Sequence, residues 1–85
     1  MAVARSLGWY VIKIHGGPYQ LSGLPDVLAI KRGRAVWAEF KRPGGEPTRI
    51  QELRIRELEA AGCRCAVVRS ATEYCGFLVK AELGA

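Results

Sequence analysis

Two short apolar stretches, separated by Arg32-Gly33, constrain the fold of this chain more than any other feature. Residues 26–31 (DVLAIK) and 35–41 (AVWAEFK) carry apolar side chains on both of their alternating faces. Strands of this kind belong to a sheet that is covered on both sides. The two stretches therefore predict a β-hairpin inside a layered α/β domain.

The rest of the sequence supplies the other elements of such a domain. Residues 9–15 (WYVIKIH) predict a first strand, residues 16–25 (GGPYQLSGLP) a loop, and residues 63–69 (CRCAVVR) a fourth strand. We expect the order βββαβα, an α/β fold with a mixed four-stranded sheet and flanking helices, preceded at most by a short N-terminal helix. The third and fourth strands are expected to be parallel, with a right-handed crossover.

Two capping-box patterns predict where the helices begin. Thr48 with Gln51 opens the first helix, and Ser70 with Glu73 opens a second that runs through about Leu83. The first helix is expected to pack through an apolar stripe formed by Ile50, Leu53, Leu58 and Ala61, and to end at Gly62.

Other residues of the first helix lie off this stripe. Ile55 is a candidate for a second contact surface, while Arg54 and Arg56, with acidic neighbours, are expected to form ordinary charged helix surface.

Length and charge narrow the class of protein. Eighty-five residues fit one domain, residues 1–85, whose thin core makes self-association a natural way to gain stability. The net charge of +5 favours an acidic partner, of which nucleic acid is the commonest.

No signal peptide or membrane-length apolar run is present, so we expect a soluble, intracellular, cytoplasmic protein without a membrane partner. Cys63, Cys65 and Cys75 lack zinc-site spacing and are expected to be reduced, packed thiols.

The hairpin register predicts a cluster of charged residues at its open end. If Arg32-Gly33 is a two-residue turn, counting outward puts Asp26 directly opposite Glu39, and Lys41 shares the face of Glu39. Two facing carboxylates destabilise a hairpin unless something offsets their charge. A Mg²⁺ ion does so, because it binds carboxylate, water and phosphate oxygens.

This cluster has the components of a phosphodiesterase site. A bound metal ion can lower the pKa of a water and neutralise phosphate charge, and Lys41 can orient the nucleophile or stabilise the transition state. Ordinary alternatives exist for each residue: Asp26 can cap a turn, and Glu39 and Lys41 can form a solvent-facing pair. The joint arrangement, with an acid inside the apolar run AVWAEF facing a second acid, favours the site.

The surrounding sequence resembles a known nuclease family. The string Gly23-Leu-Pro-Asp26, then Glu39-Phe-Lys41, Pro43-Gly-Gly and Gln51, is similar to the VRR-NUC family (virus-type replication-repair nucleases), a branch of the PD-(D/E)xK superfamily. The resemblance covers about residues 15–68. It implies a restriction-endonuclease-like core and a metal-dependent deoxyribonuclease.

The resemblance also implies roles for individual residues. Asp26 and Glu39 would bind Mg²⁺ or Mn²⁺ together with the carbonyl of Phe40, and Lys41 would be the catalytic lysine. Gln51 would line the same site, whereas the residues alone assign it to the capping box. Both roles for Gln51 stay open at this point.

Five further residues are candidate nucleic-acid contacts: His15, Tyr19, Ser22, Arg42 and Arg49. The first three lie at or near the glycine-rich loop before Asp26, and the two arginines flank the predicted site. For His15 a structural hydrogen-bonding role is the commoner alternative.

Stand-alone minimal members of this family resemble Holliday-junction resolvases and act as homodimers. The resemblance therefore implies an endonuclease that hydrolyses phosphodiester bonds of branched DNA as a homodimer, in DNA repair or recombination, with a phage-like context.

One departure from the family leaves an alternative open. Larger relatives carry an acidic residue on a helix before the first strand, and this sequence has no Asp or Glu before Asp26. A single metal ion, an acid from a partner chain or from outside this sequence, or a catalytically weak or inactive nucleic-acid-binding module with the same fold would each account for the departure.

Overall fold

The structure, a computed structural model, describes residues 2–14, 16 and 21–84. The elements along the chain are α1 (Ala2–Ser6), β1 (Tyr10–Lys13), β2 (Val27–Lys31), β3 (Arg34–Phe40), α2 (Arg49–Ala60), β4 (Arg64–Val68) and α3 (Ala71–Leu83). They confirm the order βββαβα, with α1 as a short additional N-terminal helix.

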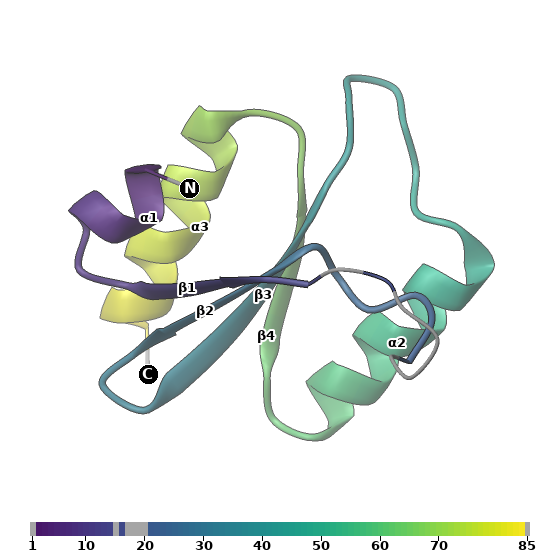
Figure 1. The fold of residues 1–85 in the computed structure, drawn as a ribbon, viewed down its shortest axis with the longest axis horizontal. Coiled ribbons are helices and arrows are strands. Elements are labelled where there is room, and N and C mark those ends of the chain that lie inside the picture. The colour runs from purple at the N-terminus through teal and green to yellow at the C-terminus, as the bar shows by residue number, and fades with distance from the viewer. Residues whose placement is uncertain (1, 15, 17–20, 85) are drawn as a thin grey trace.

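The four strands form one mixed sheet in the order β1-β2-β3-β4. The β1–β2 and β2–β3 pairs are antiparallel, and β3 and β4 are parallel. Helices α1 and α3 cover one face of the sheet and α2 lies on the other (Figure 1). The predicted α/β class with a mixed four-stranded sheet and flanking helices is therefore confirmed.

The register of the central hairpin is the predicted one. Lys31 pairs with Arg34 and Val27 pairs with Ala38, so the next step outward sets residue 26 opposite residue 39. The two turn residues, Arg32 and Gly33, have φ values of 52° and 79°, as a two-residue turn that matches strand twist requires.

The first strand is shorter than predicted. Trp9 does not belong to β1. Its backbone N–H donates to the carbonyl of Ala4 at 3.0 Å, and its side chain is buried. The predicted residues 9–15 include His15, which lies outside the described residues, and the strand within the described part is Tyr10–Lys13.

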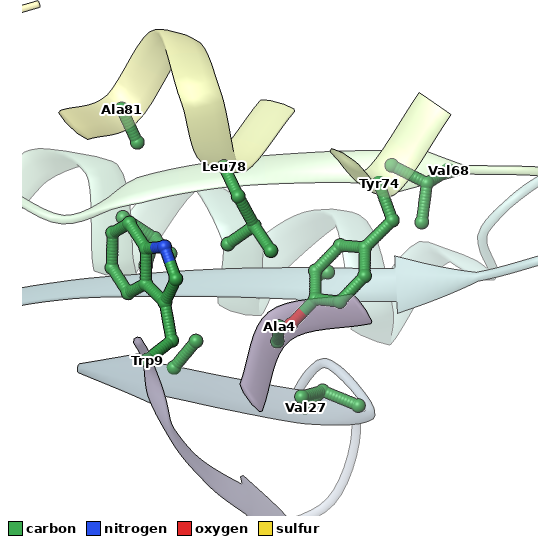
Figure 2. Packing of buried hydrophobic residues seen from close by; sticks show 10 residues of the cluster. Ala4, Trp9, Val27, Val68, Tyr74, Leu78 and Ala81 are labelled. Carbon is green, nitrogen blue, oxygen red and sulfur yellow. The ribbon is translucent and has the colours of Figure 1, made fainter. Parts of the chain in front are cut away.

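The hydrophobic core lies between the sheet and the pair α1/α3. Its buried members are Ala4, Trp9, Val27, Ala29, Val36, Ala38, Val68, Tyr74, Leu78 and Ala81 (Figure 2). The ring of Phe40 extends this core through an edge-to-face contact with Tyr74, with the two ring centroids 5.0 Å apart. Because side chains alternate along β3, the residues between these core positions, Trp37 and Glu39, face α2.

Of the predicted α2 stripe, Leu58 is half-buried as expected, while the other three members lie outside the packed face. Ile50 and Leu53 are each 39% exposed, and Ala61 is exposed as well. The half-buried positions of α2 are Gln51, Arg54, Ile55 and Leu58. These also follow the helical spacing i, i+3, i+4 and i+7, but two members are polar, so hydrophobicity alone selects the wrong face. Ile55 is half-buried on this face, and its role as a second contact surface stays a prediction.

The helix starts agree with the capping patterns, with one difference. At α2 the box is complete: Thr48 Oγ1 accepts from Gln51 N, and Gln51 Oε1 accepts from Thr48 N. At α3, Ser70 Oγ accepts from Glu73 N, while the Glu73 carboxylate accepts from the backbone N–H of Arg69 at 2.9 Å. Only the serine half of the second box is therefore as predicted.

Cys63, Cys65 and Cys75 are free thiols of intermediate burial. Within residues 2–14, 16 and 21–84, no helix has the length and apolar character needed to cross a membrane.

Candidate functional site

The open end of the β2–β3 hairpin fixes the carboxylate of Asp26. Its Oδ2 accepts a hydrogen bond of 2.8 Å from the backbone N–H of Phe40. Its carbonyl accepts from Ile14 N, also at 2.8 Å, which attaches the same residue to the end of β1. The side chain itself is exposed, so Asp26 presents a held carboxylate to solvent.

Glu39 lies opposite Asp26 in the hairpin register and is only 2% exposed. Its Oε2 accepts hydrogen bonds from Gln51 Nε2 at 3.0 Å and lies 3.3 Å from Lys41 Nζ. Its Oε1 is buried and has no hydrogen-bond partner among the described residues. Burial raises the pKa of Glu39, and the negative charge of Asp26 raises it further, while Lys41 acts in the opposite direction.

Lys41 is held by its backbone and leaves its ammonium group near the surface. Its N–H donates to the carbonyl of Val68 at 3.0 Å, which continues the pairing of β3 with β4. The side chain is 22% exposed, beside the nearly inaccessible carboxylate of Glu39. The ammonium group of Lys41 is therefore the solvent-accessible member of this ion pair.

Gln51 completes the capping box and also contacts Glu39, so the two roles that the sequence left open do not exclude each other. Its Oε1 accepts from Thr48 N at 2.9 Å, and its Nε2 donates to Glu39 Oε2 at 3.0 Å. The two contacts are compatible because an amide carries its acceptor and its donors on different atoms. The capping box thus orients the donor toward the buried carboxylate.

The oxygen atoms at this end of the hairpin suit a hard divalent cation. They include the exposed carboxylate of Asp26 and the Oε1 of Glu39, which has no hydrogen-bond partner in the described part of the chain. The backbone N–H of Phe40 points toward β2, and its carbonyl does too, because both groups of one strand residue point to the same side. The register sets Pro25 opposite Phe40, and proline has no N–H to donate to that carbonyl. In the described part of the chain no group of three or more His, Cys, Asp or Glu residues could hold a metal. The protein's share would thus be two carboxylates and one carbonyl.

The candidate DNA contacts are only partly described. His15 and Tyr19 lie outside the described residues. Ser22 is exposed, and its carbonyl accepts from Arg54 Nε at 2.9 Å. Arg42 and Arg49 are exposed beside Lys41 and at the start of α2, and within the described ranges neither guanidinium has a hydrogen-bond or ion-pair partner.

Two arginines support the site in ways that the sequence analysis missed. Arg69 donates to the carbonyl of Gly45 at 2.8 Å and pairs with Glu46 at 2.9 Å, which attaches the connection between β3 and α2 to the end of β4. Arg54, expected to be charged helix surface, is only 16% exposed and binds the Ser22 carbonyl. No sequence signal could have found either contact, because each joins residues more than twenty positions apart.

Comparison of this chain with protein-family models, with curated proteins and with solved structures finds no match. The resemblance to the VRR-NUC family therefore stays a prediction from the motif residues alone.

Proposed function

We propose that this chain is a divalent-metal-dependent endonuclease of the VRR-NUC type, which hydrolyses DNA phosphodiester bonds at the site formed by Asp26, Glu39 and Lys41. The observation that carries the proposal is the buried carboxylate of Glu39, whose Oε1 has no hydrogen-bond partner among the described residues and which lies beside a second carboxylate. An unsatisfied buried acceptor costs about 1–3 kcal/mol, and more when it is charged. A function that needs this oxygen explains why a glutamate occupies the position.

Mg²⁺ or Mn²⁺ is the cofactor that these oxygens suit, with Asp26, Glu39 and the Phe40 carbonyl as ligands. When bound, such an ion supplies an activated water and neutralises charge on the phosphate. Gln51 engages Glu39 Oε2 and so leaves Oε1 as the oxygen available for the metal.

Lys41 is the proposed electrostatic catalyst. Its ammonium group is held 3.3 Å from Glu39 Oε2 and is partly exposed. A positive charge at this point orients the attacking nucleophile and stabilises the negative charge that builds up on the phosphate oxygens in the transition state.

The proposed substrate is DNA, with branched structures such as Holliday junctions preferred. The net charge of +5 and the exposed guanidinium groups of Arg42 and Arg49, which have no partner among the described residues, support binding to a phosphate backbone. A homodimer would carry two sites related by a two-fold axis, which suits paired cuts on a symmetric junction. Exposed apolar side chains on the α2 side of the sheet, Tyr10 and Ile12, give such a dimer apolar surface to bury.

A second candidate function is a catalytically weak or inactive nucleic-acid-binding module with the same fold. It is supported by the small donor set, since the described residues hold no third acidic or histidine ligand near Asp26 and Glu39. Helix α1 (AVARS) also carries no acidic residue. This second candidate is disfavoured because holding two carboxylates close to bound phosphates costs free energy.

Cleavage of labelled four-way junction, flap and duplex DNA tests the proposal. The wild type is compared, with Mg²⁺ or Mn²⁺ and with chelator, against Asp26→Ala and Lys41→Ala. Lys80→Ala, which removes an exposed lysine from α3 on the other face of the sheet, is the matched control. We expect metal-dependent cutting, strongest on the junction, that both site variants abolish and the control retains. DNA binding without cutting of any substrate would favour the binding module instead.

A further inference from the structure

We propose that Arg54 is a positioning residue, which sets the carboxylate of Asp26 relative to Glu39 by tying the segment before Asp26 to helix α2. The inference rests on the proposed function, because it concerns how the same site is held together. Arg54 itself touches neither carboxylate in the structure, so its role is indirect.

Arg54 lies on the inward face of α2, three residues after Gln51. Its Nε donates to the carbonyl of Ser22 at 2.9 Å, and its Nη1 pairs with Glu57 at 3.0 Å on the same helix. The guanidinium therefore bridges the helix that carries Gln51 and the segment that leads into Asp26. The Arg54 side chain is 16% exposed, whereas the Glu57 side chain is 53% exposed, so Arg54 is the more buried member of the ion pair on α2.

The same segment also packs directly on the backbone of α2. Gly23 has a φ of 83°, and a Cβ built on it would lie 2.8 Å from Ile50 Cγ1 and 2.9 Å from the Ile50 carbonyl oxygen. Only glycine fits this position, because the conformation and the space each exclude a side chain. Residues 22 and 23 thus hold the segment against the first turns of α2.

Asp26 is consequently fixed from two directions. On the sheet side it receives hydrogen bonds from Ile14 N and Phe40 N, each of 2.8 Å. On the helix side Arg54 holds Ser22, four residues upstream, while Gln51 of the same helix holds Glu39. Helix α2 is therefore the common support for both carboxylates, and metal sites need their ligands placed to within about 0.5 Å.

Three substitutions separate this tether from other effects of a charge change. Arg54→Ala removes the contact to Ser22. Glu57→Ala removes the ion pair on α2 and leaves the Arg54–Ser22 contact in place. Arg56→Ala removes an exposed arginine from the same helix and serves as the charge-matched control.

The first measurement needs no metal: hydrogen exchange of two neighbouring amides in β3. The Phe40 amide is bonded to the Asp26 side chain, and the Lys41 amide is bonded to Val68 in β4. In Arg54→Ala we expect the Phe40 amide to exchange about tenfold faster or more, with Lys41 unchanged. In Glu57→Ala and Arg56→Ala both amides should keep the wild-type rates.

The second measurement is Mn²⁺ affinity, followed by the loss of the free-ion electron paramagnetic resonance signal at a temperature where every variant is folded. Residues that orient metal ligands typically change affinity about 10–100-fold, and we expect a loss of this size in Arg54→Ala alone. A wild type that binds no Mn²⁺ would refute the proposed function, and the exchange experiment would still decide the role of Arg54.

Three results would overturn the inference. The first is a wild-type Phe40 exchange rate in Arg54→Ala. The second is equal acceleration of Phe40 and Lys41, which would indicate general destabilisation. The third is an equal effect of Glu57→Ala, which would assign the role to the ion pair on α2 instead of the tether.

Discussion

Gln51 and Glu39 are joined by a hydrogen bond of 3.0 Å from Nε2 to Oε2, and the opposite end of the same amide accepts from the backbone N–H of Thr48. Because the Thr48 N–H can bond only to the amide oxygen, it fixes which end of Gln51 faces the buried carboxylate. One side chain therefore closes the start of α2 and orients the carboxylate of the candidate site.

Two substitutions separate the capping contact of Gln51 from its contact with Glu39. Thr48→Ala and Gln51→Ala each remove half of the capping box and should lower the free energy of unfolding by about 1 kcal/mol. Only Gln51→Ala removes the donor to Glu39, so only this variant should lose metal-dependent cleavage, by about tenfold or more. Urea denaturation and single-turnover cleavage measure the two effects, and an equal loss of cleavage in both variants would contradict the assignment.

Glu39 should make the stability of the metal-free protein depend on pH. Burial, with the charge of Asp26, raises its folded-state pKa above the ordinary value of 4.5, so the folded state binds more protons than the unfolded state between the two pKa values. The stabilising contribution is fully present below 4.5 and is lost as the pH rises through the folded-state pKa. Glu39→Gln should lack this loss.

Urea denaturation in the presence of chelator, over a pH series that starts below 4.5, measures this difference. We expect the wild type to lose stability relative to Glu39→Gln as the pH rises, and Mn²⁺ to restore it in the wild type alone. Parallel curves for the two proteins at every pH would show that Glu39 does not titrate as proposed.

Arg42 and Arg49 should contribute to DNA affinity through phosphate contacts. Replacing either arginine with alanine should weaken binding to all DNA sequences alike. It should also reduce the slope of log affinity against log salt concentration by about one. Fluorescence anisotropy with chelator present, over a salt series, gives the slope. Arg32→Ala, in the turn at the opposite end of the hairpin, is the control that should keep the wild-type slope.

Cys65 should be an unreactive thiol in the folded protein. Burial raises its pKa from 9.0 to about 11, with smaller effects from the charges of Glu59 and Cys63. The thiolate fraction at neutral pH then falls about a hundredfold, and alkylation should slow at least as much relative to the unfolded chain. Mass spectrometry of iodoacetamide labelling in a Cys63→Ser, Cys75→Ser protein measures the rate. Equal rates with and without urea would refute the prediction.

The hairpin and the site geometry at its open end followed from local sequence patterns. A two-residue turn fixes the register of every pair along two strands, so Arg32-Gly33 was enough to set Asp26 opposite Glu39. The start of α2 was equally local, since a capping box involves residues only three positions apart.

The support around the site was not predictable in the same way. The inward face of α2 contains Gln51 and Arg54, whose partners, Glu39 and Ser22, lie on distant segments. A hydrophobic pattern selects Ile50 and Leu53 instead, and the structure leaves both partly exposed. Polar residues that face inward reveal themselves only when the tertiary contacts that satisfy them are known.

The most direct test of the proposed nuclease is cleavage of a four-way junction by Glu39→Gln under single-turnover conditions. This substitution keeps the shape of the side chain and removes the charge that the metal needs. We expect the wild type to cut with Mg²⁺ and not with chelator, and Glu39→Gln to cut more slowly by about a hundredfold or more while it remains folded. Cutting by Glu39→Gln at the wild-type rate, or cutting by either protein in chelator, would refute the proposed metal-dependent mechanism.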